Sequence, residues 1–112
     1  DGALRAGDRM PDLTLTPNSI DAPAHPTLLT GWHAARHLAL VLRGPDSPAA
    51  PAPSLDADTL TLHTAGFDDV ARKLLGTASK LILVRPDGYV GYRGKLEPSA
   101  QLAAYLHRVA LA

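Results

Sequence analysis

Cysteine is absent from the 112 residues of this chain. Its absence excludes disulfides, a thiolate nucleophile, a thiol redox cycle and a zinc site with cysteine ligands. Aromatic residues are scarce at 4%, compared with 46% for all hydrophobic residues. We therefore expect a single domain, residues 1–112, whose core is built mainly from Leu, Val, Ile and Ala.

The chain also lacks an excess of charge, because 11 Lys and Arg residues balance 11 Asp and Glu residues. Without a basic surface, it is not expected to bind nucleic acid or an anionic membrane. The longest apolar run, residues 38–42, is far shorter than the ~20 residues of a membrane-spanning helix. Asp1-Gly2-Ala3 contains no initiator Met and no targeting signal, so we expect a cytoplasmic protein and a fragment of a longer polypeptide.

Apolar patterns predict four strands. Residues 37–42 form a continuous apolar run, which is typical of a central strand buried on both faces. Residues 59–63 alternate strictly between polar and apolar side chains, which predicts a strand. Residues 80–85 and 89–93 flank Pro86-Asp87-Gly88, a turn sequence that predicts a β-hairpin with Gly88 at positive φ.

Weaker patterns predict the connections between these strands. Residues 13–16 are expected to form a short strand with Leu13 and Leu15 facing inward, and residues 27–29 a short edge element. Residues 44–58 contain four prolines, which exclude a helix interior or a central strand. We expect this segment to be an exposed, extended loop.

Two helices are predicted. The first spans residues 68–75 and ends at Gly76, and its apolar face is expected to comprise Val70, Ala71, Leu74 and Leu75. The second opens at Glu97-Pro98, with proline at the first helical position. Its buried stripe is expected to comprise Leu102, Leu106, Val109 and Ala110.

The predicted order is a lead-in, a core strand, a long loop, a strand, a helix, a β-hairpin and a closing helix. This order predicts an α/β fold, a mixed sheet flanked by helices, with the ending of the thioredoxin fold. In a redox thioredoxin, a Cys-x-x-Cys pair follows the core strand and opens a helix. Here the corresponding residues begin Arg43-Gly44-Pro45, so dithiol oxidoreductase chemistry is excluded.

Histidines and carboxylates offer few candidates for catalysis. His33 and His37 have the i, i+4 spacing of helical zinc ligands, and a third ligand would have to come from His25, His63 or a carboxylate. We expect ordinary histidines and no metal site, because three convergent ligands are not evident. Asp68-Asp69 are best explained by capping of the first helix.

The hairpin carries the remaining candidates. Arg85 and Arg93 flank it and suggest a phosphate site, but no glycine-rich phosphate loop supports that interpretation. Tyr89 and Tyr92 suggest stacking on a ligand ring or an interface with another domain, whereas simple local packing is the more ordinary explanation.

Three segments together resemble one family: Gly7-Asp8-Arg9-Met10-Pro11-Asp12-Leu13, the core strand ending at Leu42-Arg43, and Leu83 through Val90. They are similar to the C-terminal thioredoxin-like domain of FAD-dependent aromatic hydroxylases, the class of phenol hydroxylase and polyketide-tailoring monooxygenases. The most specific part is Val84-Arg85-Pro86-Asp87-Gly88-Tyr89-Val90, followed by Gly91-Tyr92-Arg93. The opening segment also occurs in peroxiredoxin-like proteins, but a peroxiredoxin needs a cysteine that this chain lacks.

The resemblance implies a parent flavoprotein whose earlier domains bind FAD and the aromatic substrate and use NAD(P)H and dioxygen. No catalytic, cofactor-binding or metal-binding residue carries over to this chain. The expected role is noncatalytic, in packing or dimer contacts, with the parent chain's FAD- and substrate-binding domains as partners and a homodimer as a further possibility. The alternative is a freestanding, redox-inactive thioredoxin-like adaptor that binds a protein partner through the hairpin edge or the proline-rich loop.

Overall fold

A four-stranded mixed sheet forms the centre of the chain. The computed structural model describes residues 2–16, 19, 27–29, 36–45, 55–96 and 99–109. Within these ranges the strands are β1 (Leu38–Arg43), β2 (Asp58–His63), β3 (Lys80–Val84) and β4 (Val90–Gly94). They lie in the order β2-β1-β3-β4. β1 is parallel to β2 and antiparallel to β3, and β3 is antiparallel to β4.

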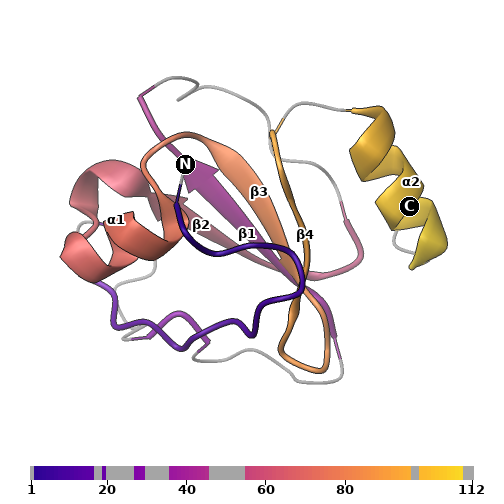
Figure 1. The fold of residues 1–112 in the computed structure, drawn as a ribbon, viewed down its shortest axis with the longest axis horizontal. Helices are drawn as coiled ribbons and strands as arrows, with labels where there is room; N and C mark the ends of the chain where they lie inside the picture. The colour runs from indigo at the N-terminus through magenta and orange to yellow at the C-terminus, as the bar shows by residue number, and fades with distance from the viewer. Residues whose placement is uncertain are drawn as a thin grey trace.

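The two helices lie on opposite sides of this sheet, which gives three layers (Figure 1). α1 (Asp69–Leu75) follows β2 and a single 3-10 turn, η2 (Thr64–Gly66), whereas α2 (Ala100–Arg108) closes the chain. This strand order, with its parallel first pair and antiparallel hairpin, is thioredoxin-like. The predicted fold class is confirmed, and the cysteine motif of redox thioredoxins is absent.

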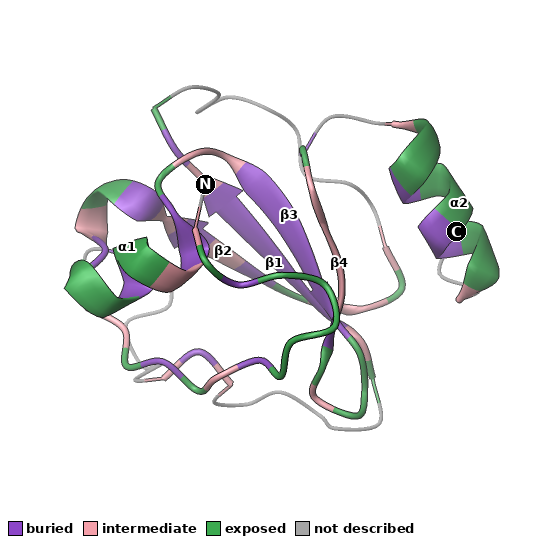
Figure 2. Cartoon of the chain, viewed as in Figure 1, coloured by how far each residue is buried: buried purple, intermediate pink, exposed green. Residues whose placement is uncertain are grey.

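The core divides into two clusters because successive side chains of a strand point to opposite faces. The larger cluster lies under α1 and includes Leu38, Leu40, Leu42, Ile82 and Val84. The smaller cluster lies under α2 and combines strand residues with helix residues: Ala39, Val41, Leu81, Leu83, Leu96, Leu102, Tyr105 and Leu106. β1 and β3 are therefore buried on both faces, as their apolar runs predicted (Figure 2).

The N-terminal segment is bonded to two distant elements. The N–H groups of Ala3 and Leu4 donate to the carbonyls of Lys73 and Leu74 near the end of α1. Farther along, Gly7 donates to the Val90 carbonyl, Val90 donates back to Asp8, and Met10 donates to Gly88. The segment thus connects the end of α1 with the β3–β4 hairpin.

The strand predicted over residues 13–16 is wrong. The structure has only an isolated antiparallel bridge between Thr14 and Thr27, although Leu13 is buried and Leu15 packs against the larger cluster. Pro11 and Pro17 bracket this segment and lack the N–H that a longer ladder needs. Residues 27–29, predicted as a short edge element, form only the Thr27 side of this bridge and a turn.

One member of the predicted face of α1 is exposed. Ala71 and Leu75 are buried and Leu74 packs beside them, but Val70 is 57% exposed. At 100° per residue, Val70 lies well around the helix from the centre of the Ala71–Leu75 face. The i, i+4 spacing alone therefore predicted too wide an apolar stripe.

The second helix begins later than predicted. α2 starts at Ala100, after Ser99, whose hydroxyl accepts a hydrogen bond from the Leu102 N–H at 3.0 Å. An extended residue with such a side-chain bond is a typical N-cap, so Ala100 is the first helical position. Glu97, Pro98 and Ala110 themselves lie outside the described residues.

Most of the proline-rich loop prediction also lies outside the described residues. Of residues 44–58, the structure describes Gly44, Pro45 and residues 55–57, followed by Asp58 as the first residue of β2. His25 and His33 are likewise not described. Among the helices that are described, none has the length and apolar character needed to cross a membrane.

Candidate functional site

The hairpin turn has the local chemistry that its sequence predicts. The Gly88 N–H donates to the Arg85 carbonyl at 2.9 Å, and the Arg85 N–H donates to the Tyr89 carbonyl at 2.8 Å. Gly88 has φ +87°, a conformation that favours glycine. Pro86 supplies the fixed φ suited to the second turn position. The predicted turn is confirmed.

Asp87 closes this turn with its side chain. Its carboxylate accepts hydrogen bonds from the Arg85 guanidinium and, at 3.2 Å, from the Tyr89 N–H. Desolvation opposes ionisation, but these hydrogen bonds outweigh it and lower the pKa of Asp87 below its usual 3.8. The Arg85–Asp87 pair is exposed, so it orients the turn more than it stabilises the fold.

Tyr89 is exposed and lies beside the N-terminal segment. It forms an isolated antiparallel bridge with Arg9, and the Arg9 Cζ lies 5.6 Å from the Tyr89 ring centroid. This distance falls within the range of a cation–π contact. The sequence did not predict that Arg9 would lie against Tyr89. Arg9 was noted only as part of the opening segment that resembles the family.

Tyr92 faces the smaller core cluster instead. Its ring centroid lies 5.7 Å from that of Tyr105 on α2, with the planes tilted by 37°. This is aromatic packing between a strand and a helix. Tyr89 and Tyr92 therefore do not form one stacking platform for a ligand ring, and local packing explains Tyr92.

Arg85 and Arg93 are not placed to share a phosphate. Arg93 lies opposite Ile82 in the β3–β4 register, so it is on the α1 face of the sheet. Arg85 approaches Gly91 and acts electrostatically on Tyr105, which packs on the α2 face. The strand alternation thus separates the two guanidinium groups.

Gly91 occupies an irregularity in β4. Leu83 is paired with Tyr92 but Val84 with Val90, so Gly91 is the additional residue of a β-bulge. A Cβ placed at Gly91 would lie only 2.0 Å from the Tyr105 hydroxyl oxygen. Tyr105 is buried, and its hydroxyl has no hydrogen-bond partner among the described residues. Burial raises the pKa of Tyr105 above its usual 10.0, so this hydroxyl stays neutral.

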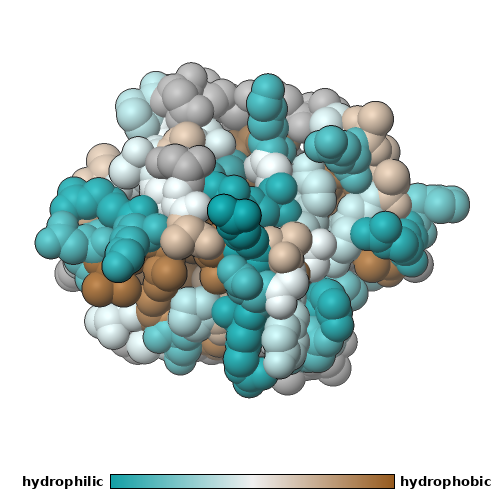
Figure 3. Space-filling model, in the orientation of Figure 1, coloured by the Kyte–Doolittle hydropathy of each residue, from teal (hydrophilic) through white to brown (hydrophobic). Residues whose placement is uncertain are grey.

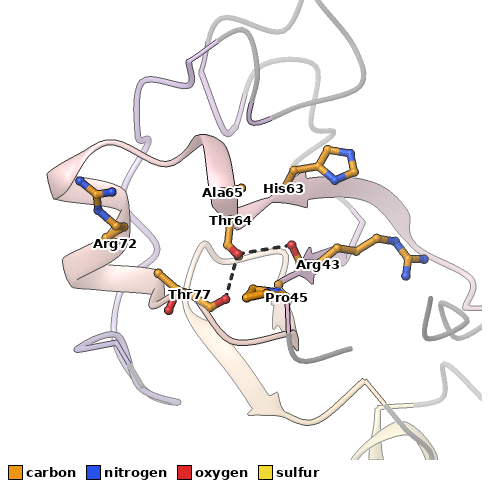
Figure 4. A pocket seen from close by; sticks show the side chains of 8 residues that line it. Arg43, Pro45, His63, Thr64, Ala65, Arg72 and Thr77 are labelled. Atoms are coloured by element: carbon orange, nitrogen blue, oxygen red, sulfur yellow. Dashed lines mark hydrogen bonds between the residues drawn. The ribbon is translucent and has the colours of Figure 1, made fainter. Parts of the chain in front are cut away.

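The other candidate location is the sheet end where a dithiol would follow β1. A cavity of about 470 Å³ lies there, lined by residues that include Arg43, His63 and Arg72. The Thr64 hydroxyl lies at its base within hydrogen-bond distance of the Thr77 carbonyl, at 2.8 Å, and of the Arg43 carbonyl, at 3.4 Å (Figure 4). Thr64 thus connects β1 with the loop before β3.

The basic side chains around this cavity do not converge. In Figure 4 the side chains of Arg43, His63 and Arg72 extend in different directions, and Arg72 forms an ion pair with Asp69 at 2.5 Å. The sequence contains no G-x-G-x-x-G phosphate loop to hold a dinucleotide. The described residues therefore do not form a site that fits FAD.

His37 and His63 lie at opposite ends of the parallel strand pair. His37 precedes Leu38, which is paired with Asp58, whereas His63 is paired with Arg43. Desolvation, together with the positive charge of Arg85, lowers the pKa of His37 below its usual 6.5, although Asp87 opposes this. Within the described part of the chain, no group of three His, Cys, Asp or Glu residues is placed to hold a metal ion.

Asp68 has the capping role predicted for it. Its carboxylate accepts a hydrogen bond from the Ala71 N–H at 2.9 Å, and Asp69 lies in the first turn of α1. Both positions are favourable for acidic side chains near a helix N-terminus.

The family comparison matches almost the whole chain. The family described as aromatic-ring hydroxylase, C-terminal, matches residues 4–110. Comparison with curated proteins and with solved structures gave no significant match. The match includes the hairpin, the core strand and the opening segment that carried the resemblance.

Proposed function

The chain belongs to the aromatic-ring hydroxylase C-terminal family, and we propose on this basis that it is the noncatalytic terminal domain of an FAD-dependent aromatic-ring monooxygenase. The observation that carries the proposal is the family match over residues 4–110 in a chain without cysteine. In the proposed parent, FAD would supply the redox and oxygen-activating chemistry, with NAD(P)H and dioxygen as cosubstrates. This chain would contribute no reacting group.

The proposed role is structural, in packing against the other domains or in dimer contacts. Support comes from the thioredoxin-like sheet end, where Arg43, Gly44 and Pro45 replace the start of a dithiol motif. The Gly44 N–H donates to the Ser79 hydroxyl at 2.8 Å, so this end is bonded within the domain. With no cysteine at this sheet end, the domain has no group for dithiol chemistry there, which supports a structural role.

The alternative is a freestanding, redox-inactive adaptor that binds a protein partner. The exposed aromatic side chain of Tyr89 favours this candidate, because tyrosine combines apolar area with a polar tip and is enriched at interfaces. Both candidates use the domain for binding, and they differ in whether the partner is part of the same polypeptide.

The coding sequence upstream of Asp1 distinguishes these proposals. A flavin-binding domain in the same reading frame is the expected result. A start codon immediately before Asp1 would contradict the leading proposal and favour the adaptor. As a second measurement, the 112-residue chain should not retain FAD through gel filtration, whereas the whole polypeptide should.

A further inference from the structure

Arg9 and Tyr89 form an exposed pair from segments that are far apart in the sequence. Both side chains are exposed, and the guanidinium carbon lies 5.6 Å from the ring centroid. Tyr89 is one of two large hydrophobic residues exposed among those that the structure describes, the other being Val70 on α1. Most of the surface visible in Figure 3 is hydrophilic or intermediate in hydropathy, with smaller hydrophobic areas between.

The pair is fixed by the backbone on both sides. Val90 donates to the Asp8 carbonyl at 2.7 Å, and Met10 donates to the Gly88 carbonyl at 2.8 Å. These bonds flank Arg9 and Tyr89, which are themselves bridged. These bonds fix the main chain of the two residues relative to each other, and the contact with the Tyr89 ring restricts the Arg9 side chain, so less side-chain freedom is lost when Arg9 binds a partner.

The neighbouring carboxylates are engaged elsewhere. Asp8 accepts a hydrogen bond from the Arg5 N–H at 2.8 Å, and Asp87 binds the Arg85 guanidinium. Among the described residues, no carboxylate forms an ion pair with Arg9. Because its guanidinium forms an ion pair with none of the described carboxylates, Arg9 presents a planar set of donors that matches a carboxylate.

We propose that the Arg9–Tyr89 pair is the contact by which this domain docks onto the flavin- and substrate-binding domains of its own polypeptide, with Arg9 binding a carboxylate on their surface. The inference rests on the proposed function, since it takes the parent hydroxylase as the partner. Arg9 supplies the complementary charge and Tyr89 the apolar area. Arginine and tyrosine are the residue types that commonly dominate such contacts.

Hydroxyl-radical footprinting of the intact hydroxylase and of the 112-residue chain tests this contact. Tyr89 is 39% exposed in the domain and Tyr105 is 5% exposed, so Tyr105 is an internal reference for a folded, buried tyrosine. In the intact polypeptide, the modification rate of Tyr89 should fall at least about fourfold towards that of Tyr105 if docking covers it. Tyr105 should react slowly in both samples.

Two variants of the intact polypeptide test whether the protection of Tyr89 depends on Arg9. Arg9→Gln should restore modification of Tyr89 to nearly the rate in the 112-residue chain. Arg5→Gln removes the same charge from an exposed residue four positions earlier and should leave Tyr89 protected. If both variants restored the modification of Tyr89, the cause would be a general effect of charge, and the proposed contact would be overturned.

The remaining outcomes separate this proposal from the proposed function. Equal modification of Tyr89 in the two samples would overturn docking, yet leave membership of a flavoprotein intact. Protection that disappears on dilution would assign the surface to a second copy of the chain and would also overturn docking within one polypeptide. A reading frame without flavin domains would overturn both proposals before any footprinting.

Discussion

The hydroxyl of Tyr105 packs directly over the backbone of Gly91. A Cβ at position 91 would be 2.0 Å from that hydroxyl oxygen and 2.9 Å from the ring carbon that bears it. The contact joins α2 to the bulge in β4, and the buried hydroxyl forms no hydrogen bond with any residue that the structure describes. It explains physically why a residue without a side chain stands between Val90 and Tyr92.

Gly91→Ala should therefore lower the free energy of unfolding by about 1–3 kcal/mol, the usual range for overpacking. Tyr105→Phe should be neutral or stabilising by up to about 1 kcal/mol, because it removes an unsatisfied buried hydroxyl. The double variant should lose less stability than the sum of the two single effects predicts, as measured by urea denaturation. Additive losses would contradict the close contact between the two residues.

Gly88→Val should lower the free energy of unfolding by more than about 1 kcal/mol, because a β-branched residue is strained at positive φ. The position itself has room, since the nearest atom to a Cβ there is 3.9 Å away in the Arg9 side chain. Gly88→Asn should cost less, because asparagine tolerates this conformation. An unchanged denaturation midpoint for the valine variant would count against the turn geometry.

Asp68→Ala should destabilise the chain by about 1 kcal/mol through loss of the N-cap of α1. Asp69→Ala is the matched control, because its carboxylate is exposed and forms an i, i+3 pair with Arg72. That change should cost about 0.5 kcal/mol or less. Thermal or urea unfolding of the two variants measures the difference, and equal losses would argue against the capping bond.

His37 should make stability depend on pH. Its pKa is lowered in the folded chain, so the unfolded chain binds a proton more readily. The contribution of His37 is therefore fully present above the unfolded value of 6.5 and is lost as the pH falls through the folded value. His37→Gln should reduce the fall in Tm between about pH 8 and pH 5. If the unmodified chain and the His37→Gln variant showed the same pH dependence of Tm, His37 would not be its source.

The central strand and the hairpin turn could be predicted because each is determined by residues close together in the sequence. The apolar run before Arg43 and the Pro86-Asp87-Gly88 turn each determine a conformation through nearby residues, and both predictions are confirmed. The caps at Asp68 and Gly76 were predictable for the same reason. The family assignment followed from the hairpin sequence and is confirmed by the match.

The features that were missed depend on contacts between distant segments. Nothing near Arg9 in the sequence indicates that it would lie over Tyr89, and nothing near Tyr105 indicates its contact with Gly91. Val70 was misplaced because helical spacing defines a possible face but not its centre. The placement of Arg85 and Arg93 on different faces of the sheet was also not evident, because the facing of these side chains depends on the pairing of β3 with β4 and on the bulge.

The N-terminal segment limits where the domain could be cut without loss of backbone hydrogen bonds. Five backbone hydrogen bonds join residues 3–10 to the end of α1 and to the hairpin: Ala3 to Lys73, Leu4 to Leu74, Gly7 to Val90, Val90 to Asp8, and Met10 to Gly88. A cut after Met10 would leave the carbonyls of Lys73, Leu74, Gly88 and Val90 without these donors, and the Val90 N–H without its acceptor. Residues 3–10 thus link the two elements mechanically. A force applied to the chain at this end would be transmitted to α1 and to the β3–β4 hairpin together.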